Sequence, residues 1–220
     1  MENIVLVGSQ GHALSVLDAI EKAGRYCVVG LLDRFREKGT IAWGYEILGA
    51  EEDLAAVASV RNVTGAVVAV GNNLARASVV RRLLEQKPEL QFPVVVHPSA
   101  TLGAGVSIDS GTVVMAGTVI NARCRIGKFC IVNTQASIGH ECVLDDYSSV
   151  APGVVLGGRV SVGEYTAVCL GARVVHKIRI GPHTVIGAGA TVLCDLPDHV
   201  VAYGTPARVV RSREESEPYL

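Results

Sequence analysis

A histidine and a glutamate stand side by side at His140-Glu141, within the stretch NTQASIGHECVLDDY that covers residues 133–147. Imidazole has an ordinary pKa of ~6.5, so it can take the proton of an amine that attacks a thioester. A neighbouring carboxylate can hold the tautomer of the ring and stabilise the imidazolium. Adjacent residues of a strand point in opposite directions, so Glu141 reaches the ring only through a bent backbone or a water molecule.

The elements that position this pair follow a six-residue repeat. Every sixth residue from Leu102 to Val192 is aliphatic, and the next position is usually Gly, Asn or Asp, which we expect to take the positive φ of a turn. This period predicts a parallel β-helix of triangular section, with three short strands and 18 residues per coil. A second inward position is small, and it holds Cys124, Cys130 and Cys142.

The 18-residue coil also predicts the neighbours of the pair. One coil away from His140 lie an alanine and Gly158, and Glu141 lies between two arginines, Arg123 and Arg159. One interpretation is a solvated turn with a charge ladder worth ~0.5 kcal/mol per pair. The other is a catalytic pair, with the Gly158 amide as a hydrogen-bond donor to an oxyanion. Spacing alone leaves both open.

The first 97 residues have a different period and alternate strand-like and helix-like segments. A small parallel sheet covered by helices is expected, with ligands at the carboxyl ends of its strands. The expected strands cover 3–8, 26–33, 65–71 and 92–96, and the expected helices cover 12–24, 50–60 and 73–87.

Three short segments at those strand ends favour a nucleotide site. The first is GSQGH, a loop that opens a helix, where free amides bind phosphates; it is not a GxGxxG motif. The others, Asp33-Arg34 and Gly71-Asn72-Asn73, converge on the same sheet edge. The aspartate would pair with a base or ribose donor, and the arginine would stack or offset charge.

Composition excludes several classes of protein. The chain of 220 residues carries 20 Lys+Arg against 21 Asp+Glu, which disfavours a nucleic-acid partner. It has no apolar run near ~18 residues and no secretory signal pattern, so we expect no membrane association and a cytoplasmic location. Its six cysteines show no CxxC spacing, so reduced thiols are favoured over disulfides or a metal site.

The motifs VGSQGH, LLDR, VGNNLAR, VVHPSA, NTQASIGHECVL and YGTPARVV occur in one order along nearly the whole chain. In this the chain resembles the bacterial nucleotide-sugar N-acetyltransferase and sialic acid O-acetyltransferase family of left-handed β-helix hexapeptide-repeat acyltransferases. The resemblance implies a Rossmann-like α/β domain over residues 1–97 and a left-handed parallel β-helix with a terminal cap over 98–210. Residues 211–220 are expected to be a disordered tail.

The resemblance also implies a reaction and its residues. A homotrimer would bind acetyl-CoA between subunits and acetylate the amino group of a nucleotide-linked amino-deoxy sugar, without a metal. His140 would be the general base, Glu141 its partner and Gly158 the substrate-facing amide. The implied substrate-binding residues are Gly8, Gly11, His12, Asp33, Arg34, Gly71, Asn72, Asn73 and Asn133. The implied acetyl-CoA contacts are Leu170, Gly171, Ala188, Gly204 and Ala207.

Three alternatives follow from the same sequence. A sialic acid O-acetyltransferase would use the same histidine on a hydroxyl group. A trimeric β-helix carbonic anhydrase would need three histidine ligands for its metal, whereas histidines are sparse here and the first domain would have no purpose. A non-catalytic sugar-nucleotide sensor would bind through the first half only.

Overall fold

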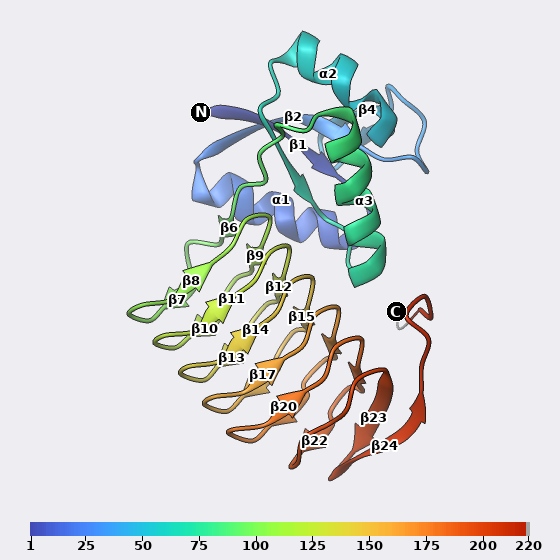
Figure 1. The fold of residues 1–220 in the computed structure, drawn as a ribbon. Helices are drawn as coiled ribbons and strands as arrows, with labels where there is room; N and C mark the ends of the chain where they lie inside the picture. The colour runs from blue at the N-terminus through green and yellow to red at the C-terminus, as the bar shows by residue number, and fades with distance from the viewer. Residues whose placement is uncertain (219–220) are drawn as a thin grey trace.

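The computed structural model describes residues 1–218, in which an α/β unit sits on one end of a long β-helix (Figure 1). The α/β unit contains strands β1 (Glu2–Val7), β2 (Tyr26–Leu32), β3 (Ile41–Ala42), β4 (Tyr45–Gly49) and β5 (Gly65–Val68), helices α1 (Gly11–Ala23), α2 (Leu54–Arg61) and α3 (Asn73–Gln86), and the short 3₁₀ helix η1 (Glu51–Asp53). No helix within residues 1–218 has the length and apolar content needed to cross a membrane.

The strands of this unit form one sheet in the order β3-β4-β2-β1-β5. Three of the four expected strands pair in parallel in this sheet, and the three expected helices are confirmed. Gly24, in the left-handed conformation, caps the end of α1. Sequence reasoning missed β3 and β4, which form a hairpin whose second strand pairs in parallel with β2. Trp43 and Gly44 both have positive φ in its two-residue turn. Because Trp is rarely chosen for such a turn, no hairpin signal is visible in the sequence.

The β-helix is built from parallel strands of two residues that pair with the strand 18 residues away, for example Ile120 with Ile138. One sheet has the order β22-β19-β16-β13-β10-β7, the second β20-β17-β14-β11-β8, and the third β24-β23-β21-β18-β15-β12-β9-β6. The bounds are β6 (Val95–Val96), β7 (Thr101–Leu102), β8 (Ser107–Ile108), β9 (Val113–Val114), β10 (Val119–Ile120), β11 (Arg125–Ile126), β12 (Ile131–Val132), β13 (Ser137–Ile138), β14 (Val143–Leu144), β15 (Ser149–Val150), β16 (Val155–Leu156), β17 (Ser161–Val162), β18 (Ala167–Val168), β19 (Arg173–Val174), β20 (Arg179–Ile180), β21 (Val185–Ile186), β22 (Thr191–Val192), β23 (Val200–Gly204) and β24 (Ala207–Ser212).

The repeated aliphatic positions form the core of the β-helix. They are buried from Val114 to Val192, and Cys124, Cys130 and Cys142 are buried beside them. Leu102 and Ile108 are the exceptions, because β7 and β8 are the terminal strands of their sheets and no further coil covers them.

The turn prediction was wrong by two positions. The left-handed residues of the coils are not the glycines after the aliphatic positions; they are residues such as Glu141, with a φ of 58°, and Arg159, with a φ of 61°. The glycines are needed instead for close packing between coils. A Cβ atom on Gly139 would lie 2.5 Å from the backbone nitrogen of Gly158 in the next coil.

Two predicted boundaries also need correction. The segment 92–96 was expected to be the last strand of the first domain, but β6 pairs with β9 and belongs to the β-helix. The tail expected from residue 211 overlaps the end of the terminal hairpin and contacts the β-helix. Strand β24 extends to Ser212, and Arg213 is buried and donates to the carbonyl of His183 at 3.0 Å. Residues 219–220 lie outside the described residues.

A buried arginine joins the two units. Arg76 of α3 is 1% exposed, and its guanidinium donates to the carbonyls of Phe129 and Tyr147 in the β-helix, at 2.8 and 3.0 Å. The same group donates to the carbonyls of Val70 and Gly71 after β5, at 2.9 and 3.1 Å. Arg76 therefore fixes the loop at the carboxyl end of β5 against the coils.

Candidate active site

His140 and Glu141 lie at the corner between β13 and β14, and their side chains meet. The Nδ1 atom of His140 is 2.9 Å from the Oε2 atom of Glu141, although the residues are adjacent. The left-handed backbone of Glu141 provides the bend that this contact needs. The imidazole has 60% of its side-chain surface exposed, so a substrate can approach it.

The glutamate sets the tautomer of the imidazole. The Nε atom of Arg159 lies 3.0 Å from the same carboxylate oxygen, whereas Arg123 forms no ion pair within residues 1–218. The pKa of the Glu141 carboxyl is lowered, first by the hydrogen bond from His140 and then by that from Arg159. Because an ionised carboxylate only accepts hydrogen bonds, Nδ1 carries the proton of the neutral ring. The lone pair of Nε2 is then available to a substrate.

Gly158 lies directly beneath the imidazole. A Cβ atom at this position would be 2.4 Å from the Nε2 atom of His140, so only glycine leaves room for the ring. The Arg159 amide donates to the His140 carbonyl at 2.8 Å and fixes the relative height of the two coils. The candidate base and a candidate amide donor are thus neighbours on one corner.

Replacement of Gly158 by alanine is expected to lower turnover by about 10–10²-fold, because the new methyl group must displace the reactive nitrogen. The φ angle of Gly158 is not in the left-handed region, so alanine fits the backbone itself. The check is steady-state kinetics beside circular dichroism and thermal unfolding. Unchanged turnover in a folded G158A variant would contradict the packing of the ring on Gly158.

A cavity of about 390 Å³ lies at the carboxyl ends of the α/β strands, as the sequence predicts. Its lining includes Gly8, His12, Asp33, Arg34 and Gly71 from three different loops, and also Phe35, Glu51 and Arg82, which sequence reasoning missed. We call it the sheet-edge cavity. It is a compact site of the kind expected for a nucleotide.

The charged residues of this cavity are partly engaged by the protein itself. The Asp33 carboxylate accepts hydrogen bonds from the Ser9 hydroxyl at 2.5 Å and from the Phe35 amide at 2.8 Å, so it shapes the loop. Arg34 donates to Glu51, which also binds Arg82 at 3.0 Å. The free carboxylate that the sequence suggested for a base or ribose is thus committed to two protein donors.

Three of the predicted substrate residues line neither the sheet-edge cavity nor the apolar cavity along the β-helix. Gly11 begins α1 at the surface. Asn72 caps α3, where its Oδ1 atom accepts from the Ala75 amide at 3.0 Å. Asn73 is 1% exposed and donates to the carbonyls of Tyr165 and Thr166, at 3.1 and 3.2 Å, so it braces the β-helix.

A second cavity, of about 630 Å³, lies between the α/β unit and the third sheet of the β-helix. It is mostly apolar, and we call it the coil groove. Its lining includes Asn133, Leu170 and Ala188 among the predicted residues, whereas Gly171, Gly204 and Ala207 do not line it. Gly204 and Ala207 pair with each other in the terminal hairpin.

The two cavities share His12 and Gly71, so they meet at the loop that opens α1. Burial, together with the nearby Arg76, lowers the pKa of His12 to about 4. The ring is therefore neutral near physiological pH. Its Nε2 atom is buried and has no hydrogen-bond partner within residues 1–218.

His140 does not lie in either cavity of the same chain. The coil groove follows the corner after β12, β15, β18 and β21, whereas His140 lies at the next corner, after β13. The face that contains β10, β13 and β16 separates the two corners. A single chain therefore does not bring its own histidine to its own groove.

This combination of a β-helix, a corner histidine and a sheet-edge cavity is the one expected of a hexapeptide-repeat acyltransferase with a nucleotide-type first domain. A family model described as the PglD N-terminal domain matches residues 3–83. The fold is similar to that of perosamine N-acetyltransferase from Caulobacter crescentus, in a variant with a histidine replaced by asparagine and in complex with CoA and GDP-perosamine. The two chains are 32% identical and have a TM-score of 0.90, and the match covers 96% of this chain and 98% of that one. The chain belongs to the left-handed β-helix family of bacterial nucleotide-sugar N-acetyltransferases.

Two further comparisons are with other acetyltransferases. The acetyltransferase domain of PglB from Neisseria gonorrhoeae, in complex with acetyl coenzyme A, is 29% identical with a TM-score of 0.86, covering 95% of this chain and 99% of that one. Serine acetyltransferase from Synechococcus elongatus is 32% identical over 143 residues, which are 61% of this chain and 50% of that protein. The chain spans at most about half the length of the curated serine acetyltransferases that it matches.

Proposed function

We propose that this protein transfers the acetyl group of acetyl-CoA to the amino group of a nucleotide-linked amino-deoxy sugar. The observation that carries the proposal is the contact between His140 and Glu141, 2.9 Å long, beside Gly158 at an exposed corner. This contact supports a role for His140 as proton acceptor beside the Gly158 amide, and the sheet-edge cavity supports a separate site for a nucleotide.

In the proposed reaction, the neutral amine attacks the thioester carbonyl while the Nε2 atom of His140 accepts the proton that the nitrogen loses. The Gly158 amide donates a hydrogen bond to the oxyanion of the tetrahedral intermediate. Glu141 stabilises the imidazolium. Collapse of the intermediate breaks the carbon–sulfur bond and releases the CoA thiolate, which takes up the proton. No acyl-enzyme forms.

The cavities suggest where each substrate binds. We assign the nucleotide to the sheet-edge cavity, near Gly8, Asp33 and Gly71. The neutral His12 lies where this cavity opens into the coil groove, so it is placed to contact the linked sugar or diphosphate. The apolar wall at Leu170 and Ala188 suits the pantetheine arm of acetyl-CoA.

We propose that the active protein is a homotrimer. His140 and the coil groove occupy different corners of one chain, so a second chain has to supply the missing half of each site. A threefold ring brings the His140 corner of every chain beside the groove of a neighbour and closes on itself.

Mixed trimers test this arrangement. H140A removes the base, and A188W fills the coil groove, so each variant alone is expected to be inactive. When the two are co-expressed with different tags and purified through both, each mixed trimer keeps one intact site, and about one third of the wild-type activity should return. If the mixed trimers stay inactive although both single variants form trimers, base and groove do not come from different chains.

We also propose a cytoplasmic location, where acetyl-CoA is available. Cys124 and Cys142 are one coil apart, yet both are free thiols, and each donates to a glycine carbonyl. Unpaired neighbouring thiols fit a reducing compartment.

A thermal-shift screen of nucleotide sugars, followed by a thiol-release assay with the best binder, tests the proposed activity. Amino sugars on a nucleotide should stabilise the protein and release CoA from acetyl-CoA. Binding without thiol release would favour a sensor over an enzyme.

A further inference from the structure

A ladder of rings runs along the corner of the β-helix that precedes the third sheet, and it ends in two histidines. The first contact, between Phe92 and Phe129, is edge-to-face, and the later ones are stacked. Consecutive ring centroids are 5.0, 5.1, 5.2, 4.8 and 4.8 Å apart. The members in order are Phe92, Phe129, Tyr147, Tyr165, His183 and His199. Phenylalanine or tyrosine would continue the stack equally well, so stacking does not account for the nitrogen atoms of the last two rings.

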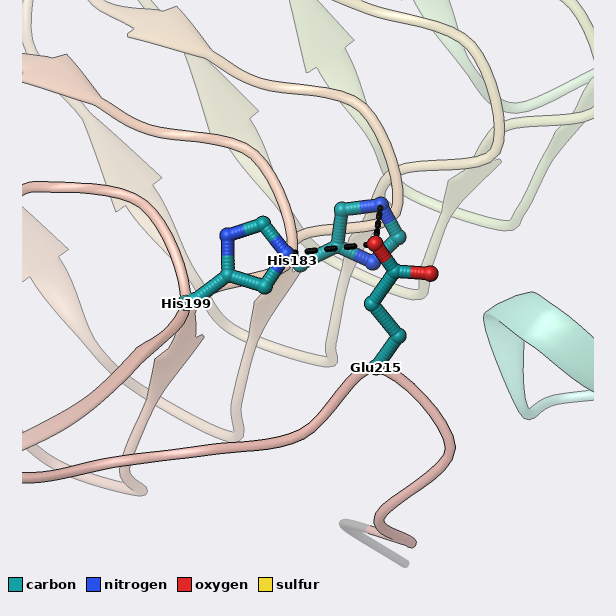
Figure 2. A group of neighbouring side chains, drawn as sticks. All are labelled: His183, His199 and Glu215. Carbon is teal, nitrogen blue, oxygen red and sulfur yellow. Dashed lines mark hydrogen bonds and ion pairs between the residues drawn. The ribbon is translucent and has the colours of Figure 1, made fainter.

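A carboxylate joins these two histidines (Figure 2). The Oε1 atom of Glu215 lies 3.3 Å from the Nε2 atom of His199 and 3.7 Å from the Nε2 atom of His183. One ligand atom from each residue lies within 4.8 Å of the others. Glu215 comes from the segment after β24, which runs back from the end of the β-helix toward the α/β unit (Figure 1).

The ring of His183 has no hydrogen bond within residues 1–218. The residue is 8% exposed, its Nδ1 atom is buried without a partner, and its Nε2 atom is too far from Glu215 for a hydrogen bond. The Nε2 atom, which faces Glu215, is therefore not engaged in a hydrogen bond with any described residue and is the ring atom available to a bound ion.

We propose that His183, His199 and Glu215 bind one Zn²⁺ ion or a similar divalent transition metal ion. Two imidazoles and one carboxylate are a ligand set that proteins use for zinc, with water in the fourth position. Metal–ligand bonds of about 2.0–2.2 Å in a tetrahedron require ligand atoms about 3.3–3.5 Å apart. The distances from the carboxylate to the two rings are already close to this range.

Binding requires one change in geometry. The two rings are inclined by only 17°, so their in-plane lone pairs run side by side. His199, with 39% of its side chain exposed, has room to turn toward His183. Its Nδ1 atom lies 3.5 Å from the Oδ2 atom of Asp198, an arrangement in which an outer carboxylate orients a ligating histidine.

The metal would have a structural role and would hold the C-terminal segment against the β-helix. Arg213 already donates to the carbonyls of His183 and Glu217, so this segment contacts the β-helix without the ion. The ion would add a link between Glu215 and the two coils that carry the histidines. The site lies on a different corner from His140, which is between β13 and β14. The inference is therefore independent of the proposed acetyl transfer.

Zn²⁺ titration of the untagged protein against a chromophoric chelator tests the site, in a background with Cys27 and Cys194 changed to serine to remove the exposed thiols. We expect one Zn²⁺ per chain and a thermal midpoint that rises with Zn²⁺ but not with Mg²⁺, which prefers oxygen ligands. H199Q and E215Q should each weaken binding by more than about tenfold, since even changes outside the ligand set cost that much.

H176Q, which alters an exposed histidine on another corner, is the matched control and should bind Zn²⁺ as the parent does. Circular dichroism shows whether each variant is folded. The proposal is overturned if the parent binds no Zn²⁺, or if folded H199Q and E215Q bind it as tightly as the parent. A loss of stability in E215Q that is the same with and without Zn²⁺ would mean an ion pair only, and would also overturn it.

Discussion

Replacement of His140 by alanine is expected to lower turnover ~10²–10⁴-fold, the usual contribution of a positioned general base. The amine must lose a proton as it attacks, and the exposed Nε2 atom beside Gly158 is the acceptor in the proposed reaction. Nucleotide-sugar binding should be largely unchanged, because the sheet-edge cavity contains no part of this corner. Steady-state kinetics and calorimetric binding measure the two effects separately.

The matched control for this variant is H176A, an exposed histidine two coils further along the same corner. It should retain turnover within a few-fold of the wild type. Equal activity of H140A and the wild type would remove His140 from the mechanism. A loss of nucleotide binding in H140A would point instead to a structural role.

Replacement of Arg76 by methionine is expected to lower the free energy of unfolding by about 3–5 kcal/mol, the cost of breaking a buried charged network. Methionine is apolar, so the carbonyls of Phe129, Tyr147, Val70 and Gly71 would all lose a buried donor. Two of those carbonyls belong to the loop at the sheet-edge cavity, so KM for the nucleotide sugar should rise as well.

Denaturant unfolding of R76M and of R81M tests this expectation, since Arg81 is exposed on the same helix and its loss should cost little. A change below about 1 kcal/mol in R76M would show that the two units are held together by other contacts. It would also mean that the loop after β5 is positioned without this arginine.

The six-residue period was sufficient to predict the β-helix, because few folds other than a β-helix need an inward aliphatic residue at every sixth position. It did not predict which turn residue is left-handed. Position 139 requires glycine because the backbone of the next coil lies too close for a side chain. The residue with the left-handed backbone conformation is Glu141. That difference matters for the site, since the bend at Glu141 is what joins the carboxylate to the imidazole.

The sheet-edge cavity was predictable from the loops that follow parallel strands, and Gly8, His12 and Gly71 lie there. The roles of the individual asparagines were not predictable, because an amide side chain after a strand can equally well contact a ligand, cap a helix or hydrogen-bond to a neighbouring element. Asn72 caps α3, and Asn73 hydrogen-bonds to the β-helix. Arg76 contacts residues that lie 53 and 71 positions away along the chain, and no local sequence pattern predicts contacts at such separations.

The identity of the product tests the central claim most directly. The protein should be incubated with acetyl-CoA and a nucleotide-linked amino-deoxy sugar, and the sugar nucleotide analysed by mass spectrometry before and after hydroxylamine. Acetyl transfer to the amine predicts one added acetyl group that survives hydroxylamine, with H140A as the inactive control. An acetyl group removed by hydroxylamine would be an ester and would mean O-acetylation, and no acetylated product across the nucleotide amino sugars that bind would contradict the proposed function.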